Sequence, residues 1–301
     1  MKAVLLQGYG GVDQLSYRDV PQPEPQKGEV LVKVAATSIN PVDWKLRRGD
    51  LQAVMPLHIP AILGRDVAGT VVALGPGTQG LRQGDRVMGL VNQSYAEFLV
   101  AKADILTRIP EGLEFEDAAA LPLVTLTGAQ LIEKGVRPQA GQTVLVTGAV
   151  GGVGRTAVFV AKKHGATVIA GVRASQMKAA EALGADRCIA IDEGGELGSL
   201  GKLDAIADTA GHDAIVRLLP YIRSGGVLAT VVGKPQQADG KDFRVEEIWA
   251  QPDADQLRSL AEAVARKEFF IPISRRMKLS QIREAQTLGE SGGSGKIVLV
   301  P

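Results

Sequence analysis

The segment 142–172 constrains the fold of this chain more than any other. Its β-branched run Thr143–Thr147 predicts a buried parallel strand, and Thr167–Val172 predicts a second one. Between them an apolar helix is expected over about 152–164, because Gly165 and Ala166 end the apolar pattern before the second strand begins. Strand, helix and strand within about 30 residues predict a βαβ unit.

A glycine-rich turn joins the first strand to the helix. It consists of Ala149, Val150, Gly151, Gly152, Val153 and Gly154, a dinucleotide-binding pattern with alanine in place of its first glycine. Gly151 would let the backbone approach a pyrophosphate, and Gly154 would let the helix pack closely on the strand. The helix amino terminus would offer free N–H groups to the phosphates. Because the strand and the helix flank the pattern as required, we predict that these six residues bind a nucleotide rather than form a merely structural turn.

The end of the second strand indicates which dinucleotide is bound. An NAD site expects Asp or Glu about 20 residues after the glycines, where it accepts hydrogen bonds from the ribose 2′-hydroxyl. No acidic residue stands between Glu133 and Glu181, whereas Arg173 ends the strand and is followed by Ser175 and Lys178. A guanidinium, a hydroxyl and an ammonium suit a 2′-phosphate, so NADP(H) is predicted. The alternative for Lys178 is a solvated place on a helix face.

Composition restricts the class of protein. A chain of 301 residues, 45% hydrophobic and 22% charged, is long enough for two globular domains. Its net charge of +1 gives no case for binding nucleic acid or an anionic membrane. The single cysteine, Cys188, excludes an internal disulfide and a cysteine-based zinc cluster and fits a reducing compartment. The sequence shows neither a signal peptide nor a long apolar run, so we expect a cytoplasmic protein with no membrane partner.

Short β-rich runs separated by proline and glycine clusters fill the first 121 residues and predict a small irregular β-barrel or sandwich. The expected strands are 2–7, 15–20, 29–35, 67–74, 86–90 and 95–100. Asp43 is available to cap a short helix that ends at Gly49.

Strands and helices alternate after the glycine-rich turn, which favours a doubly wound parallel sheet. The expected elements are strand 187–191, strand Leu203–Asp208, helix 213–222, strand 226–232 and an edge strand 242–249. A helix at 257–267 is expected to close this domain. The tail should add a helix near 279–288 and the strand Lys296–Val300.

Seven motifs in family order give the whole chain a specific resemblance. They are segments 8–11, 38–43, 64–69, 84–87, 95–97, 149–154 and 295–299. The chain resembles zinc-free members of the medium-chain dehydrogenase/reductase superfamily, of the quinone oxidoreductase (zeta-crystallin-like) type. The resemblance implies an α/β fold with a Rossmann-type doubly wound parallel sheet at 122–270. It also implies a GroES-like β-barrel formed by 1–121 with 271–301, and an active site in the cleft between the two.

The same resemblance shows which metal ligands are missing. Zinc-dependent alcohol dehydrogenases place a cysteine ligand and a histidine ligand in the segments that here hold Asn40 and Arg65. The three histidines, His58, His164 and His212, are widely separated in the sequence, so no metal site is predicted. Without a Lewis acid an alcohol is a difficult hydride donor. Quinones and α,β-unsaturated carbonyls (enones) stabilise added charge themselves, and NADPH-dependent reduction of one of these is expected.

The resemblance also gives three catalytic candidates. Asn40 would face the nicotinamide and donate to an acceptor oxygen, or instead cap the turn before Pro41. Thr127 would touch the nicotinamide or its ribose, or instead pack between helices. Tyr95 would be a proton donor, or instead pack within a strand.

Further cofactor contacts are expected where strands end. Ligands of open α/β sheets bind at the carboxyl ends of the strands, so these residues should line the nicotinamide half of the site: Ala210, Gly211, Val231, Val232 and Gly233. Lys296 is expected either to contact the cofactor or to form a structural ion pair. Asp66 is expected to pair with Arg47 or Arg48.

Two other functions and an assembly state remain open at this point. An NADPH-binding protein with a structural or regulatory role would need the cofactor site but no productive acceptor site. An enoyl-thioester reductase should need a basic entrance for its carrier arm, and no such cluster is evident. The predicted edge strand 242–249 could pair with its copy in a homodimer.

Overall fold

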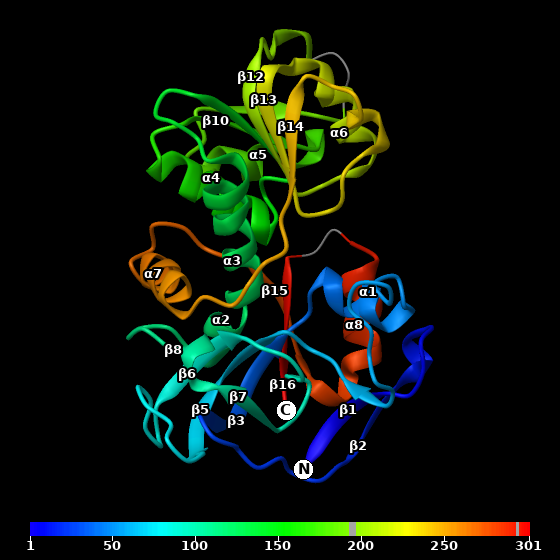
Figure 1. Cartoon of the computed structure of the whole chain (residues 1–301), viewed down its shortest axis with the longest axis vertical. Coiled ribbons are helices and arrows are strands. Elements are labelled where there is room, and N and C mark those ends of the chain that lie inside the picture. Colours follow the sequence, from blue (N-terminus) through cyan, green and yellow to red (C-terminus); the bar gives the residue numbers. More distant parts are fainter. Residues whose placement is uncertain (193–196, 293–294) are drawn as a thin grey trace. The chain divides into compact units, whose positions relative to one another are not determined.

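The computed structural model describes residues 1–192, 197–292 and 295–301, and it divides the chain into two compact units. The first unit contains Met1–Leu123 and Pro252–Pro301, and the second contains Val124–Gln251. Figure 1 colours both along the sequence. No helix in the described ranges is long and apolar enough to span a lipid bilayer.

Six parallel strands form the sheet of the second unit, in the order β11-β10-β9-β12-β13-β14. They are β9 (Thr143–Thr147), β10 (Thr167–Val172), β11 (Arg187–Ala190), β12 (Leu203–Asp208), β13 (Ile222–Thr230) and β14 (Phe243–Glu247). Counted along this unit, the order is 3-2-1-4-5-6, the order of a doubly wound nucleotide-binding sheet. The predicted fold class is therefore confirmed. In Figure 1, β12, β13 and β14 lie side by side.

The inner strands β9, β10, β12 and β13 are mostly buried, as is typical of a parallel sheet whose faces are covered, whereas the edge strand β14 carries charged residues. Leu145, Ile206 and Leu228 come from three neighbouring strands and are completely buried in one core cluster. The helices that follow the strands are α4 (Gly152–Lys163), α5 (Met177–Ala180) and α6 (His212–Leu218). Helix α4 buries Ala157 and Val158. It ends with two lysines, whose positive charges interact favourably with the partial negative charge at the carboxyl end of the helix.

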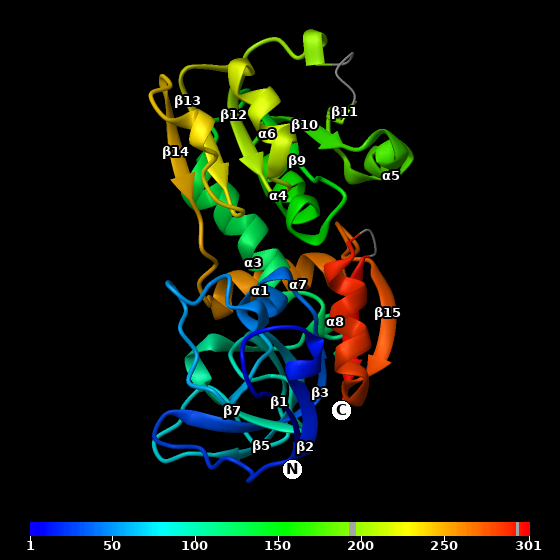
Figure 2. The same cartoon turned by 90° about the vertical axis from the view of Figure 1, so that its right-hand side faces the viewer.

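The first unit is built from two sheets whose strand pairs are antiparallel, except that β15 and β16 of the tail pair in parallel. A three-stranded sheet has the order β2-β1-β4, and a seven-stranded one has the order β15-β16-β3-β5-β6-β8, with β7 also paired to β3. The bounds are β1 (Lys2–Leu6), β2 (Leu15–Asp19), β3 (Glu29–Ser38), β4 (Ala61–Ile62), β5 (Asp66–Leu74), β6 (Arg86–Leu90), β7 (Phe98–Lys102), β8 (Leu106–Arg108), β15 (Ile273–Lys278) and β16 (Lys296–Val300). Figure 2 shows β1 beside β2 near the amino terminus.

The tail belongs to the first unit because β16 pairs with the end of β3, where Val298 lies opposite Ser38. The helices of this unit are α1 (Pro41–Arg48), α2 (Phe115–Ala119), α7 (Ala254–Ala265) and α8 (Ile282–Glu290). Helix α3 (Pro122–Gln130) carries the chain from one unit into the other.

One helix differs from its expected place. The sequence assigned the helix at 257–267 to the nucleotide-binding domain, but α7 lies in the first unit, against β8. The first unit therefore resumes at Pro252 instead of at residue 271. An amphipathic pattern such as that of Leu257, Leu260 and Ala261 indicates that one face of the helix is buried, but it does not indicate which core the face packs against.

Candidate active site

The glycine-rich turn packs tightly against neighbouring backbone at Gly154 and has more free space beside Gly151. A Cβ atom on Gly154 would lie 2.3 Å from the carbonyl oxygen of Gly148 and 2.7 Å from Cα of Ala149, so only glycine allows the helix to pack this closely. A Cβ atom on Gly151 would meet nothing nearer than that same oxygen, at 3.3 Å. Gly151 is also the N-cap of α4, where unpaired N–H groups begin. The turn thus fits a bound pyrophosphate.

Helix α3 packs tightly against the first turns of α4. A Cβ atom on Gly128 would lie 2.4 Å from the carbonyl oxygen of Val153, and one on Gly152 would lie 3.1 Å from Cβ of Val124. This close approach brings Thr127, which is 8% exposed, to the neighbourhood of the glycine turn. Of the three catalytic candidates, Thr127 is the one in the same unit as the nucleotide site.

A buried carboxylate organises the carboxyl ends of three strands. Asp208 ends β12, and its Oδ1 accepts hydrogen bonds from Oγ1 of Thr147 at 2.7 Å and from N of Gly211 at 2.9 Å. Its Oδ2 accepts from Oγ1 of Thr230 at 3.1 Å. Asp208 therefore ties β9, β12 and β13 together at the edge where ligands of such sheets bind. Sequence reasoning missed it, because Asp208 reads only as the last residue of a strand.

The other residues predicted to lie at this edge come directly after β12 and β13 in the sequence. Ala210 and Gly211 come after β12, and the N–H of Ala210 lies 3.3 Å from Oγ1 of Thr147. Val231, Val232 and Gly233 come after β13. Gly233 has φ of +103°, and a Cβ atom placed on it would meet no atom within 4 Å. The structure thus gathers the glycine turn and both strand ends at one edge of the sheet.

The three residues expected to bind the 2′-phosphate all follow the end of β10, and Arg173, Ser175 and Lys178 are exposed. No ion pair joins Arg173 or Lys178 to another residue within the described ranges. The N–H of Ala174 donates to Oδ1 of Asp192 at 2.8 Å, an acidic neighbour that the sequence did not place here. These two cations are available for an anion.

The first unit contains a separate buried polar cluster centred on Asp66. Its Oδ2 accepts from Oγ of Ser38 at 2.5 Å, from Nδ2 of Asn40 at 2.8 Å and from Nζ of Lys296 at 3.2 Å. Its Oδ1 accepts from the backbone N of Leu123 at 2.7 Å. Both oxygens of this fully buried carboxylate are therefore hydrogen-bonded, by four donors in all.

Asn40 is fixed at three points. Lys296 donates to its Oδ1, its Nδ2 donates to Asp66, and its backbone N donates to Oδ2 of Asp43 at 2.8 Å. It is also the N-cap of α1 and has no exposed surface. Each residue thus makes the contacts of one of its two predicted roles. Lys296 forms an ion pair, and Asn40 stands at the start of a helix.

A second carboxylate, Asp43, lies behind Asn40. The hydroxyl of Tyr95 donates to Oδ2 of Asp43 at 2.7 Å, while Oδ1 of Asp43 is buried and has no hydrogen-bond partner among the described residues. Desolvation by burial raises the pKa of Asp43 to about 7, and the nearby Asp66 adds to the rise. Burial and the charge of Asp43 raise the pKa of Tyr95 well above 10. Tyr95 is completely buried and precedes β7.

One predicted pairing is wrong. Neither Arg47 nor Arg48 bonds to Asp66: Nε of Arg47 donates to Gln286 at 2.7 Å, and its NH2 group pairs with Glu290 at 2.6 Å. Asp66 pairs with Lys296 from β16 instead. Charge alone could not identify these partners, because each lies more than 200 residues away along the chain.

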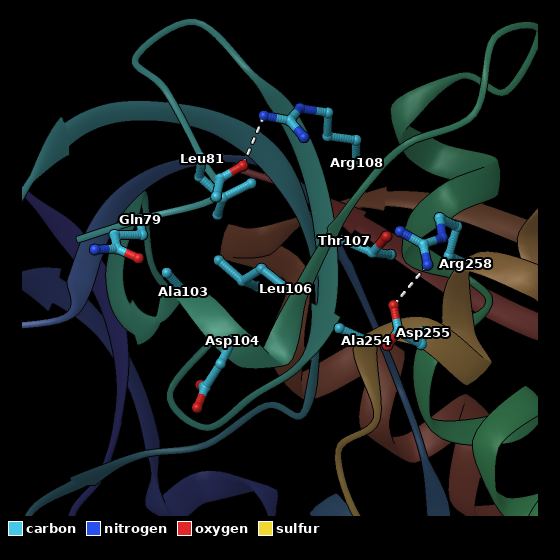
Figure 3. Close-up of a pocket in the computed structure, with 11 residues that line it drawn as sticks. Gln79, Leu81, Ala103, Asp104, Leu106, Thr107, Arg108, Ala254, Asp255 and Arg258 are labelled. Atoms are coloured by element: carbon cyan, nitrogen blue, oxygen red, sulfur yellow. Dashed lines mark hydrogen bonds and ion pairs between the residues drawn. The ribbon is translucent and has the colours of Figure 1, made fainter.

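The first unit also has a hollow of about 300 Å³ that lies outside this polar cluster (Figure 3). Leu81, Leu106, Arg108 and Arg258 are among the residues that line it. Arg108 donates to the carbonyl oxygen of Gly80 at 2.7 Å, and Arg258 donates to Asp255 at 2.6 Å. Both arginines already have partners, so the hollow offers no arrangement suited to hydride transfer.

Comparisons with known proteins agree with this division of the chain. Residues 26–111 match the family described as the alcohol dehydrogenase GroES-like domain, and residues 152–252 match the one described as zinc-binding dehydrogenase. Within the described ranges, no three His, Cys, Asp or Glu side chains are grouped so that they could hold a metal ion.

Individual relatives are similar over all or most of the chain. A chloroplast envelope quinone oxidoreductase homolog from Arabidopsis thaliana is 30% identical over 100% of this chain and 98% of its own. A chloroplastic NADPH-dependent alkenal/one oxidoreductase of the same plant is 32% identical over 77% of this chain and 63% of its own. The quinone oxidoreductase structure from Coxiella burnetii has a TM-score of 0.89 and 31% identity, and the match covers 100% of this chain and 99% of that one.

Proposed function

Because this chain belongs to the quinone oxidoreductase type of the medium-chain dehydrogenase/reductase superfamily, we propose that it is an NADPH-dependent reductase of quinones or enones. The single observation that carries this proposal is the open glycine turn, with exposed Arg173 and Lys178 following the next strand. Relatives that are named quinone oxidoreductase and alkenal/one oxidoreductase support the acceptor class.

The residues of the second unit fit NADPH. Gly151 and the start of α4 would hold the pyrophosphate, and Arg173, Ser175 and Lys178 would hold the 2′-phosphate. The strand ends at Ala210–Gly211 and 231–233 would line the nicotinamide half, with Thr127 at its ribose. When bound, the nicotinamide supplies a hydride to the acceptor.

The chemistry of the acceptor follows from what this chain offers. Quinones and enones accept a hydride into a conjugated system, so the protein has to orient the acceptor and stabilise a developing oxyanion. No dedicated nucleophile is needed for that reaction. Within the first unit, Asn40 and Tyr95 hold the start of α1 in place in this proposal, because both are completely buried and hydrogen-bonded.

We also propose a cytoplasmic location, because a single cysteine fits a reducing compartment.

We further propose that the protein forms a homodimer along β14. Strand β14 ends the sheet, and Trp249, which follows it, is 53% exposed. An uncovered edge strand beside a large aromatic side chain is suited to pairing with a copy of itself. Light scattering on Trp249→Asp should then give the monomer mass where the unchanged protein gives the dimer mass; equal masses would contradict this interface.

The function itself is tested by following NADPH and NADH oxidation with ortho- and para-quinones, linear enones and simple aldehydes. The proposal predicts turnover of quinones or enones with a preference for NADPH. Tight NADPH binding without turnover of any acceptor would instead favour a binding protein. Selective turnover of coenzyme A enoyl thioesters would favour an enoyl-thioester reductase.

A further inference from the structure

The end of β11 brings an acid to the cofactor side of the sheet in the second unit. Strands β10 and β11 pair in parallel, so their carboxyl ends meet at the same edge (Figure 2). Asp192 follows β11, and its Oδ1 accepts a hydrogen bond of 2.8 Å from the backbone N of Ala174. Ala174 directly follows Arg173. The carboxylate therefore lies beside the turn that carries the residues proposed to bind the 2′-phosphate.

Backbone contacts fix the place of Asp192. The N–H of Ile191 donates to the carbonyl oxygen of Val172 at 2.8 Å, so the pairing of β10 with β11 extends to the residue before Asp192. Arg217 of α6 donates to the carbonyl oxygen of Ile191 at 2.6 Å. The fold itself thus holds Asp192 at the end of β10, through bonds that need no ligand.

The charge of Asp192 is not neutralised within the fold. No ion pair joins Asp192 to any other residue that the structure describes, and its Oδ2 has no hydrogen-bond partner there. Arg217 donates to the backbone oxygens of Ile191 and Asp192 rather than to the carboxylate. Asp192 is also exposed. One carboxylate oxygen is therefore available to accept a hydrogen bond from a ligand.

An NAD site of this fold uses an acid at this place. There an Asp or Glu at the end of the second strand accepts hydrogen bonds from the ribose 2′-hydroxyl. Arg173 holds that position here and suits a 2′-phosphate instead. Asp192 supplies a carboxylate from the third strand, and it reaches the residue next to Arg173. The site thus combines cations suited to the phosphate with an acid suited to the hydroxyl.

We propose that Asp192 determines how strongly the site distinguishes NADPH from NADH. This inference rests on the proposed function, because it concerns the same cofactor site. The carboxylate accepts a hydrogen bond from the 2′-hydroxyl of NADH. It repels the 2′-phosphate of NADPH, which carries a charge of about −1.5 to −2 near neutral pH. Arg173 and Lys178 favour NADPH, and Asp192 limits this preference, so the protein binds both cofactors.

The test replaces Asp192 by asparagine, which keeps the shape and an oxygen for the N–H of Ala174 but removes the charge. Ligand-observed NMR titrations use adenosine 2′,5′-bisphosphate and adenosine 5′-monophosphate, which differ only in the 2′-phosphate. Asp192→Asn should lower the Kd of the bisphosphate about 3- to 10-fold, because a repulsion is removed. It should raise the Kd of the monophosphate about 3- to 10-fold, because a neutral acceptor replaces a charged one.

Asp186 gives a matched control at the other end of the same strand. It directly precedes β11, and its Oδ2 accepts from the backbone N of Val168 at 2.7 Å, much as Asp192 accepts from that of Ala174. Asp186→Asn therefore removes the same charge at the amino ends of the strands. Its Kd values for both nucleotides should match those of the unchanged protein, at a temperature where both variants are folded.

Salt provides a readout that a merely structural role would not move. Because salt screens exposed charges, the gain of Asp192→Asn for the bisphosphate should shrink as the ionic strength rises. The assignment requires opposite changes for the two nucleotides, and equal changes, no change or any other pattern would overturn it. If the unchanged protein bound neither nucleotide, the proposed cofactor site would fail first and this inference with it. Cofactor binding without turnover of any acceptor would contradict the proposed function alone, since these titrations need no turnover.

Discussion

The hydroxyl of Tyr95 donates a hydrogen bond of 2.7 Å to Oδ2 of Asp43, and neither side chain has any exposed surface. The other oxygen of this carboxyl group is buried without a partner in the described part of the chain. An ionised carboxylate is costly in such surroundings, which explains why the pKa of Asp43 rises from 3.8 to about 7.

Stability should therefore depend on pH through Asp43. The unfolded chain loses this proton near pH 3.8 and the folded protein near pH 7, so between these values the folded state binds more protons. Its stabilising contribution is complete below pH 3.8 and is lost as pH rises toward 7, by on the order of 4 kcal/mol at most. Urea unfolding at pH 5 and pH 8 measures this. Asp43→Asn is the control, because the unchanged protein should exceed it in stability by more at pH 5 than at pH 8. A pH-independent difference would contradict the burial argument.

The charge of Arg173 should distinguish the two cofactors. Arg173→Ala removes a charge-assisted hydrogen bond to the 2′-phosphate, worth about 1.5–3 kcal/mol, so the Kd for NADPH should rise about 10- to 150-fold. The Kd for NADH, which lacks that phosphate, should stay the same. Fluorescence titration with both cofactors measures this, and Arg18→Ala in the first unit is the control. Equal weakening for the two cofactors would argue that Arg173 does not bind the 2′-phosphate.

Asp208 and Asp204 form a matched pair on β12. Asp204 lies near the amino end of the strand and accepts from N of Thr143 at 2.7 Å, whereas Asp208 ties together the carboxyl ends. Each change to Asn should lower stability by about 1–3 kcal/mol, because a charged hydrogen-bond acceptor is lost. Only Asp208→Asn should also weaken NADPH binding, as measured by calorimetry at a temperature where both variants are folded. Equal weakening by both variants would move the ligand away from the carboxyl edge.

Gly151 should matter for binding and much less for folding. Its φ of −72° is one that alanine adopts, and a Cβ atom there meets only the carbonyl oxygen of Gly148, at 3.3 Å, so a shift of a few tenths of an ångström makes room for it. The added methyl group should hinder a pyrophosphate and raise the Kd for NADPH while the melting temperature stays close to that of the unchanged protein. Gly198→Ala is the control, since its Cβ would meet no atom within 4 Å. Unaltered affinity in Gly151→Ala would mean that the phosphates do not lie against this turn.

The elements that the sequence predicted best are the buried parallel strands. Thr143–Thr147 and Thr167–Val172 have the expected bounds because mostly apolar runs rich in β-branched residues leave little choice of period or face. Leu203–Asp208 also has the expected bounds, although Asp204 and Asp208 interrupt its apolar pattern. The glycine turn was recognised from its spacing between a strand and a helix. The structure gives the physical reason for that spacing, because the backbone around Gly154 leaves no room for a side chain.

Long-range polar contacts could not be predicted in the same way. Lys296 reaches Asn40 and Asp66 across more than 200 residues, and Arg47 reaches Glu290 across a similar separation. Such partners depend on how strands from distant segments meet, as when β16 joins β3. The carboxylate of Asp192 likewise reaches Ala174 only because β11 lies beside β10.

The central claim is that this protein transfers a hydride from NADPH to a conjugated acceptor, and isotope transfer tests it most directly. NADPH carrying deuterium at both hydrogen positions of the nicotinamide C4 would be incubated with the protein and a linear enone, and the product analysed by mass spectrometry and NMR. The account predicts a saturated ketone with deuterium on its β-carbon and none on its α-carbon, formed equally well with a chelator present. A saturated ketone without deuterium, or no reduction of any quinone or enone, would contradict it.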